Sequence, residues 1–174
     1  MLNQFLGIIN IISKNPSNPR FSHYTFESIG VILTYSSMQL LPQLINSIMP
    51  VFLAILSEDI QEFTPYVFQI IAFSVEKGKA VPDSIRQLVQ PILSPALWEM
   101  KGNIPAVTRL LKSLISADQS LFPDLVPVLG IFQRLIASKV QDVYGFEILD
   151  CIMIEVEINR LKPYLKQIAV LLLQ

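Results

Sequence analysis

The chain has 174 residues, of which 52% are hydrophobic and only 16% are charged. An ordinary soluble domain carries about 25% charged residues, so most helical surfaces here should be covered by neighbouring elements, and intrinsic disorder is disfavoured. Lysine and arginine number 13 against 14 acidic residues, and the resulting formal charge of -1 offers no bulk attraction to a phosphate backbone. The balance therefore predicts no nucleic-acid partner.

The chain begins with a predicted helix at about residues 2 to 14. Its sequence, MLNQFLGIINIISKN, is apolar but has no basic residue before the apolar stretch and no small-residue cleavage site. A secretory signal peptide needs both features. We interpret this segment as an orphan helix, the second half of a preceding helix pair.

Four prolines set a period along the rest of the chain. Pro42, Pro82, Pro123 and Pro163 lie 40, 41 and 40 residues apart, and each opens a run with apolar residues at helical spacing. Proline is tolerated in a first helical turn because the backbone N–H groups there have no intrahelical acceptor. The pattern predicts four second helices, near 39 to 56, 82 to 94, 120 to 138 and 159 to 174.

Upstream of each proline lies another amphipathic run. These runs predict first helices near 20 to 36, 60 to 77, 104 to 117 and 142 to 157, and three of them carry a closely spaced tyrosine and phenylalanine. Residues suited to cap helix N-termini stand near the boundaries, namely Asp59, Asn103, Ser120 and Asp142. Each unit is therefore predicted to be helix, turn, helix.

The fold class that follows is all-α. β-Branched residues are scattered at helical spacing and no hairpin turn separates alternating runs. Helix pairs that repeat at about 40 residues match HEAT repeats, which span roughly 40 to 47 residues. We predict one HEAT-repeat segment over 1 to 174, a superhelical solenoid of about four helix pairs. Its repeats fall at about 20–56, 60–94, 104–138 and 142–174, after the orphan helix 2–14.

Glycines and further prolines within the predicted helices suggest packing constraints. Gly7, Gly30 and Gly130 should mark points of close helix approach, because glycine inside a helix costs about 1 kcal/mol relative to alanine. Three more prolines lie deeper in the second helices and should bend them, since each lacks a hydrogen-bond donor. These prolines are Pro50, Pro91 and Pro127.

A membrane-spanning segment is a possible alternative because no charged residue occurs between Glu27 and Glu58. Pro42 and Pro50 interrupt this stretch, several Ser, Thr, Gln and Asn residues dilute it, and no basic cluster flanks it. We therefore predict buried helix surface and no membrane insertion.

A search for chemistry finds no catalytic, cofactor-binding or metal-binding constellation. There is no glycine-rich phosphate loop, and the single cysteine and single histidine cannot build a zinc site by themselves. Cys151 is expected to be buried, and His23 is expected to be a cap or a packed ring. Arg109 and Lys112 are interpreted as solvated surface. The chain is predicted not to be an enzyme and to need no cofactor.

The acidic cluster Glu58, Asp59 and Glu62 has two interpretations. Negative charge near a helix N-terminus is stabilising, which accounts for the cluster without any partner. The alternative is an acidic inter-repeat loop that faces a basic partner.

Three stretches carry a family resemblance: NPSNPRFSHYTFESIG (15 to 30), SEDIQEFTPYVFQIIAF (57 to 73) and the run from 101 to 139. They closely resemble the fungal form of the CAS-type exportins of the importin-β superfamily, and the resemblance covers essentially the whole chain. It implies a piece from the C-terminal half of a longer receptor that binds importin-α together with Ran-GTP and shuttles between nucleus and cytoplasm. The main Ran contact would lie outside this piece.

In that family the second helices line the cargo-facing surface, so the resemblance places candidate partner-binding residues there by helix position. These are Gln43, Asn46, Arg86, Gln90, Asp124, Arg134, Lys162 and Lys166. Two other hypotheses stay open. The chain could be a structural or self-associating HEAT spacer, with apolar end faces that pair with each other, or a regulatory HEAT scaffold for an enzyme.

Overall fold

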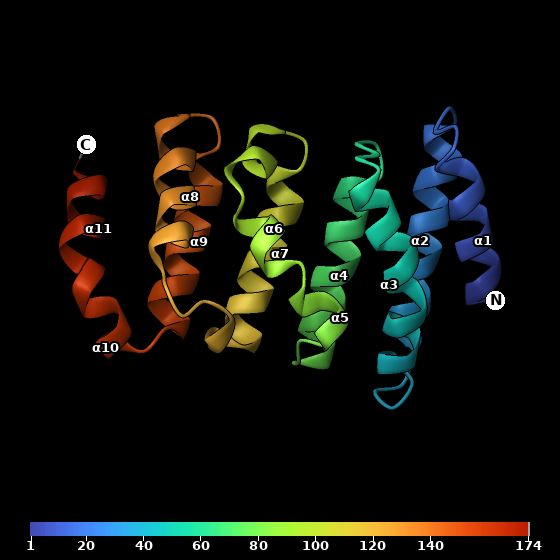
Figure 1. Ribbon diagram of the computed structural model, residues 1–174, viewed down its shortest axis with the longest axis horizontal. Coiled ribbons are helices and arrows are strands. Elements are labelled where there is room, and N and C mark those ends of the chain that lie inside the picture. The colour runs from blue at the N-terminus through green and yellow to red at the C-terminus, as the bar shows by residue number, and fades with distance from the viewer. Residues whose placement is uncertain (174) are drawn as a thin grey trace.

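The computed structural model describes residues 1–173, and it shows helix pairs that stand side by side along one axis with the two termini at opposite ends (Figure 1). Gln174, the predicted end of the last helix, lies outside the described residues.

The first helices of the pairs are α2 (Pro19–Tyr35), α4 (Thr64–Gly78), α7 (Ile104–Ala117) and α9 (Asp142–Glu155). The second helices are α3 (Leu41–Ser57), α5 (Asp83–Arg86) with α6 (Val89–Leu93), α8 (Val126–Ala137), and α10 (Ile158–Leu161) with α11 (Leu165–Leu172). Helix α1 (Leu2–Ile12) precedes them, and η1 (Pro95–Glu99), η2 (Gln119–Leu121) and η3 (Lys162–Tyr164) are short 3-10 helices.

The helices form two layers. Helix α4 packs on α2 and, most extensively, on α7, and α7 packs in turn on α9, so the first helices make one layer. Helix α3 contacts α1 and α5, and α6 contacts α8, so the second helices make the other. We call these the first-helix layer and the second-helix layer. In Figure 1 α3, α6 and α8 lie in front of the first-helix layer.

One continuous apolar core runs between the layers from α1 to α11. Phe26 of α2 shows how it is built, because its ring packs on Phe63 and stacks on Tyr66 at a centroid distance of 5.0 Å, and both partners belong to the next pair. Residues 1–173 contain no β-strand, and within this part of the chain no helix is long and apolar enough to cross a membrane. The predicted all-α HEAT solenoid is confirmed.

Local signals explain where several helices start. The Asn18 side chain accepts a hydrogen bond of 3.1 Å from the backbone N–H of Phe21, and Pro19 is the first residue of α2. Pro42 lies in the first turn of α3 as predicted, and Pro82 immediately precedes α5.

The prediction of a continuous helix over 120 to 138 is wrong. The residue before a proline is disfavoured in the helical region, and Phe122, before Pro123, has φ -121° and ψ 67°. The chain therefore forms η2 and starts a new helix only at Val126. Pro127 then lies in the first turn of α8, where it removes no hydrogen bond, so it cannot bend that helix as predicted.

The second helix predicted over 82 to 94 is also interrupted, since it consists of α5 and α6. Pro91 is the third residue of the short α6, so Pro50 is the proline that lies inside a long second helix. Residues 95 to 99 form η1, and the Trp98 indole N–H there donates 2.8 Å to the carbonyl of Ile92. That bond fixes the buried ring of Trp98 beneath the turn.

Three of the four predicted caps are wrong, and one of these is Asp142, which is the first residue of α9 while Gln141 occupies the N-cap position. Asp59 has φ 51°, a left-handed conformation in the turn after α3, and α4 begins only at Thr64. Ser120 lies inside η2, where its N–H and hydroxyl both donate to the carboxylate of Asp118. Asn103 does precede α7, but its side chain makes no capping hydrogen bond.

The glycine prediction is also wrong in its positions. A Cβ added at Gly7, Gly30 or Gly130 would meet nothing within 4 Å. The close approach is at Gly145 of α9, where a Cβ would lie 3.0 Å from Cγ2 of Ile136 and 3.2 Å from Cβ of Leu135. Helix α9 therefore packs on α8 through this glycine.

Gly145→Ala should destabilise the protein by about 1 kcal/mol, because the new methyl group overpacks the α8–α9 contact. Gly130→Ala is the matched control in α8, where the open space lets alanine stabilise the helix by up to about 1 kcal/mol. Thermal unfolding of both variants checks this. Shifts of the same sign and size would contradict the assignment of the close contact to Gly145.

Candidate functional site

The partner-binding residues expected from the resemblance are all exposed and all lie in the second-helix layer or its connections. Gln43 and Asn46 belong to α3, and Asp124 lies in the turn before α8. The others are Arg86 on α5, Gln90 on α6, Arg134 on α8, Lys162 on η3 and Lys166 on α11. The structure thus spreads these eight side chains over one layer rather than gathering them in one pocket.

Three of these residues connect neighbouring repeats. The Arg86 guanidinium lies 2.8 Å from the carboxylate of Asp118, and that of Arg134 lies 2.9 Å from the carboxylate of Glu99. The carboxylate of Asp124 accepts a hydrogen bond of 3.2 Å from the Tyr164 hydroxyl. These polar groups are engaged within the chain and stabilise the stack.

The remaining polar groups are available to a partner. Within residues 1–173, the side chains of Gln43, Asn46, Gln90 and Lys166 have no hydrogen-bond or ion-pair partner, and Lys162 bonds to Asn159, three residues before it. Gln90 also lines a cavity of about 320 Å³ beside Asp124. This is the one place where two of the expected residues share a cavity among those described.

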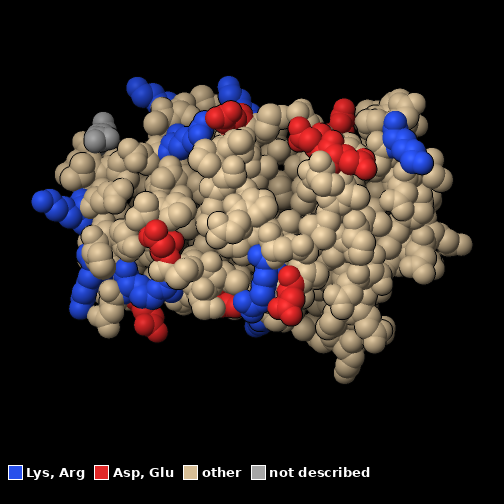
Figure 2. All heavy atoms as spheres, in the orientation of Figure 1, with Lys and Arg blue, Asp and Glu red and all other residues tan. Residues whose placement is uncertain are grey.

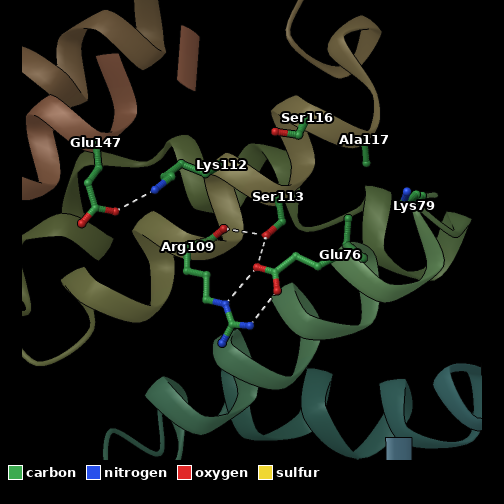
Figure 3. Close-up of a pocket in the computed structure, with 9 residues that line it drawn as sticks. Glu76, Lys79, Arg109, Lys112, Ser113, Ser116, Ala117 and Glu147 are labelled. Atoms are coloured by element: carbon green, nitrogen blue, oxygen red, sulfur yellow. Dashed lines mark hydrogen bonds and ion pairs between the residues drawn. The ribbon is translucent and has the colours of Figure 1, made fainter. Parts of the chain in front are cut away.

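A second concave surface, which the sequence did not predict, lies in the first-helix layer. We call it the outer groove: a cavity of about 740 Å³ between α4, α7 and α9 (Figure 3). Arg109 donates from Nε and Nη2 to the two carboxylate oxygens of Glu76, at 2.9 and 2.6 Å. The Ser113 hydroxyl donates to the same carboxylate at 2.8 Å. Such a bidentate pair combines strength with a fixed geometry.

The next contact along the outer groove joins α7 to α9. Lys112 Nζ lies 2.8 Å from a carboxylate oxygen of Glu147, as the left side of Figure 3 shows. Arg109 is exposed, as expected, and Lys112 is half-buried, but each also pairs with a carboxylate of a neighbouring repeat, which the interpretation as solvated surface did not include. Glu76 and Arg109 lie 33 residues apart, and Lys112 and Glu147 lie 35 residues apart, close to the length of one repeat. This spacing of opposite charges is the sequence signal that could have predicted the two pairs.

Electrostatics in the outer groove favour the charged forms of Glu76 and Arg109. The hydrogen bonds from Arg109, helped by that from Ser113, lower the pKa of Glu76 below its ordinary value of 4.5 despite partial burial. The Glu76 carboxylate in turn raises the pKa of Arg109. Since the two ion pairs satisfy these groups mutually, the outer groove holds three repeats in register and contains no poised acid and base.

The single cysteine and single histidine are packing residues. Burial raises the pKa of the Cys151 thiol, which therefore stays protonated. His23 Nδ1 lies 3.3 Å from the Tyr66 hydroxyl and joins α2 to α4. Across residues 1–173 no three His, Cys, Asp or Glu side chains are placed to hold a metal ion.

The two stacked helix layers and the continuous apolar core between them define a HEAT-type solenoid. The family model described as "CAS/CSE protein, C-terminus" matches residues 1–174. The chain belongs to this family, as the sequence resemblance indicated.

Similar proteins whose names state a role support this family assignment. The chain is 66% identical over its whole length to the importin alpha re-exporter of Saccharomyces cerevisiae, of which it covers 18%. It is 46% identical to the importin-alpha re-exporter of Schizosaccharomyces pombe, with 99% of the chain aligned to 19% of that protein. It is 38% identical to human exportin-2, with 100% of the chain aligned to 19% of that protein. These relatives are transport receptors.

A solved structure confirms the fold. The exportin Cse1 in its cargo-free, cytoplasmic state superposes with a TM-score of 0.96 at 66% identity, over 99% of this chain and 19% of that one. The chain thus spans less than a fifth of the length of the relatives it matches.

Replacing Glu76 with glutamine should lower the free energy of unfolding by about 1 kcal/mol at pH 7, the upper range for partly exposed ion pairs. Because the folded state depresses the pKa of this carboxyl, its stabilisation is complete above pH 4.5 and is lost as the pH falls through the lower folded value. Urea unfolding between pH 7 and about pH 3 should show the difference from wild type disappear in acid.

Glu27→Gln is the control, because Glu27 is exposed and has no partner among the described residues. It should leave stability unchanged at both ends of the pH range. A Glu76→Gln effect that persisted undiminished in acid would show that packing rather than charge is responsible.

Proposed function

We propose that this chain is a segment of a nuclear export receptor that binds importin-α together with Ran-GTP and returns importin-α to the cytoplasm. The observation that carries the proposal is the full-length similarity to proteins named importin-alpha re-exporter, at 66% and 46% identity. A receptor of this kind shuttles between nucleus and cytoplasm. The repeats at about 20–56, 60–94, 104–138 and 142–174 are its proposed structural units.

The exposed polar side chains of the second-helix layer support a role in binding. Gln43, Asn46 and Gln90 have no partner within residues 1–173, so they can exchange hydrogen bonds with water for hydrogen bonds with a protein. We assign importin-α to this surface and place the main Ran-GTP contact on other repeats of the receptor. Arg86 and Arg134 hold the repeats that present the surface.

A solenoid of this kind acts mechanically. Each repeat contacts only its neighbours, so small rotations between adjacent pairs add up to a change of superhelical pitch. The surface can thus open and close around a partner without a local hinge.

The triple variant Gln43→Ala, Asn46→Ala, Gln90→Ala should weaken importin-α binding about tenfold, as expected for the loss of several modest polar contacts. Binding is measured by calorimetry with and without GTP-loaded Ran, on this chain and on a longer receptor that includes the preceding repeats. The long form should bind in the presence of Ran-GTP, and this chain alone should bind more weakly.

The control triple is Glu27→Ala, Gln69→Ala, Asp150→Ala, which removes three exposed polar side chains from the first-helix layer. It should change the affinity by less than about twofold. Equal losses in both triples would contradict the assigned surface, and failure of the long form to bind importin-α at all would contradict the export function.

Self-association is a second candidate because both end helices expose apolar side chains. Ile11 of α1 is 71% exposed, and Leu172 and Leu173 near the end of α11 are 49% and 88% exposed. Exposed apolar end faces of repeat stacks tend to pair. Sedimentation over a range of concentrations decides the question, since a strictly monomeric species would eliminate a spacer that works by self-association.

A further inference from the structure

An apolar groove lies at the edge of the molecule where the first pair meets the second, beside the connection to the third. We call it the edge groove. It has a volume of about 680 Å³, within the range of roughly 300 to 1,000 Å³ typical of binding pockets. Its walls come from the end of α3, the start of α4, α6 and η1, and its apolar side chains include Leu53, Leu56, Phe68, Leu97 and Met100.

One rim of the edge groove is acidic. Asp59 lines the groove, and Glu58 and Glu62 are exposed in the same connection between α3 and α4. None of the three forms an ion pair within residues 1–173. Figure 2 shows acidic atoms gathered at the upper edge over this connection.

The opposite rim does not neutralise this charge. Glu99 and Lys101 are the chain neighbours of Met100, which lines the groove; Glu99 is already paired with Arg134, and Lys101 is one exposed cation against three carboxylates. An anionic membrane surface or a nucleic acid would be repelled by such a rim, whereas lysine or arginine side chains would be attracted.

The side chain of Asn103 also lines the edge groove. Only 6% of the surface of this residue is exposed, and its side chain has no hydrogen-bond partner in the part of the chain that the structure describes. An asparagine at this position normally caps the following helix, yet here it makes no capping bond to α7. Its amide offers one acceptor and two donors, which is the pattern that a peptide group can satisfy.

We propose that the edge groove is a docking site for a protein segment in which two or three apolar side chains are flanked by lysine or arginine. The apolar anchors lie on Leu53, Phe68 and Met100, the basic flanks face Glu58, Asp59 and Glu62, and the Asn103 amide bonds to the backbone of the segment. The edge groove shares α3 and α6 with the surface assigned to importin-α but none of the residues assigned to that binding, and the proposal does not depend on that assignment.

The test uses a fluorescein-labelled synthetic peptide in which Leu-Leu-Ser-Leu is flanked on both sides by two lysines. Fluorescence anisotropy should show that the wild-type chain binds it. A version with glutamate for lysine loses the attraction to the acidic rim, and a version with serine for leucine loses the apolar anchors. Each should bind at least about tenfold more weakly.

Variants locate the binding. Glu58→Gln, Asp59→Asn, Glu62→Gln together should weaken it about tenfold, and asparagine at 59 tolerates the left-handed backbone. Ala96→Trp, at an exposed position that lines the groove, should block the peptide. The matched control Glu27→Gln, Asp150→Asn, Glu157→Gln removes three exposed carboxylates elsewhere and should stay within about twofold.

Binding that follows this pattern supports the proposal. Equal weakening by both acidic triples, undiminished binding by the Ala96→Trp variant, or no binding by the wild-type chain overturns it. Because the probe contains no importin-α and no Ran, none of these outcomes bears on the export function.

Discussion

The burial of apolar surface between consecutive helix pairs is the constraint on which the structure depends. A single pair covers only one side of each helix, and the other side must be covered by the next pair. Phe26 illustrates this, since it packs on Phe63 and Tyr66 of the following pair as well as within its own. The low fraction of charged residues is the consequence, because only the outer surfaces of the two layers meet water.

Polar side chains are divided between two tasks on this framework. Arg109 and Lys112 in one layer, like Arg86 in the other, reach carboxylates of adjacent repeats and fix how the pairs stand against each other. Each such contact is partly exposed and worth little by itself, so the apolar core supplies the stability and the ion pairs supply the register. Side chains that are not used in this way, such as Gln43 and Asn46, remain available for partners.

The proline period and the apolar spacing predicted the fold class and the first helices, because these depend on local chemistry that each repeat carries. The candidate partner-binding residues came from the family resemblance instead and stay a prediction. The predictions of helix boundaries were wrong where a second local rule, the restriction on the residue before a proline, opposed the helical pattern. Pro123 restricts Phe122 and delays α8, which the proline period alone does not reveal. The close contact at Gly145, rather than at Gly130, depends on which helix faces which, and the pairing of Glu76 with Arg109 depends on the rotation between repeats. Neither can be obtained from one sequence without the packed structure.

The measurement that tests the stacking account most directly is native-state hydrogen exchange followed by mass spectrometry. Stability built from contacts between neighbours should be graded along the chain. The account predicts the slowest exchange in α4 and α7, which pack on each other most extensively and have neighbours on both sides, and the fastest in α1 and α11. A single common rate for all these helices would show one cooperative globule and contradict the account.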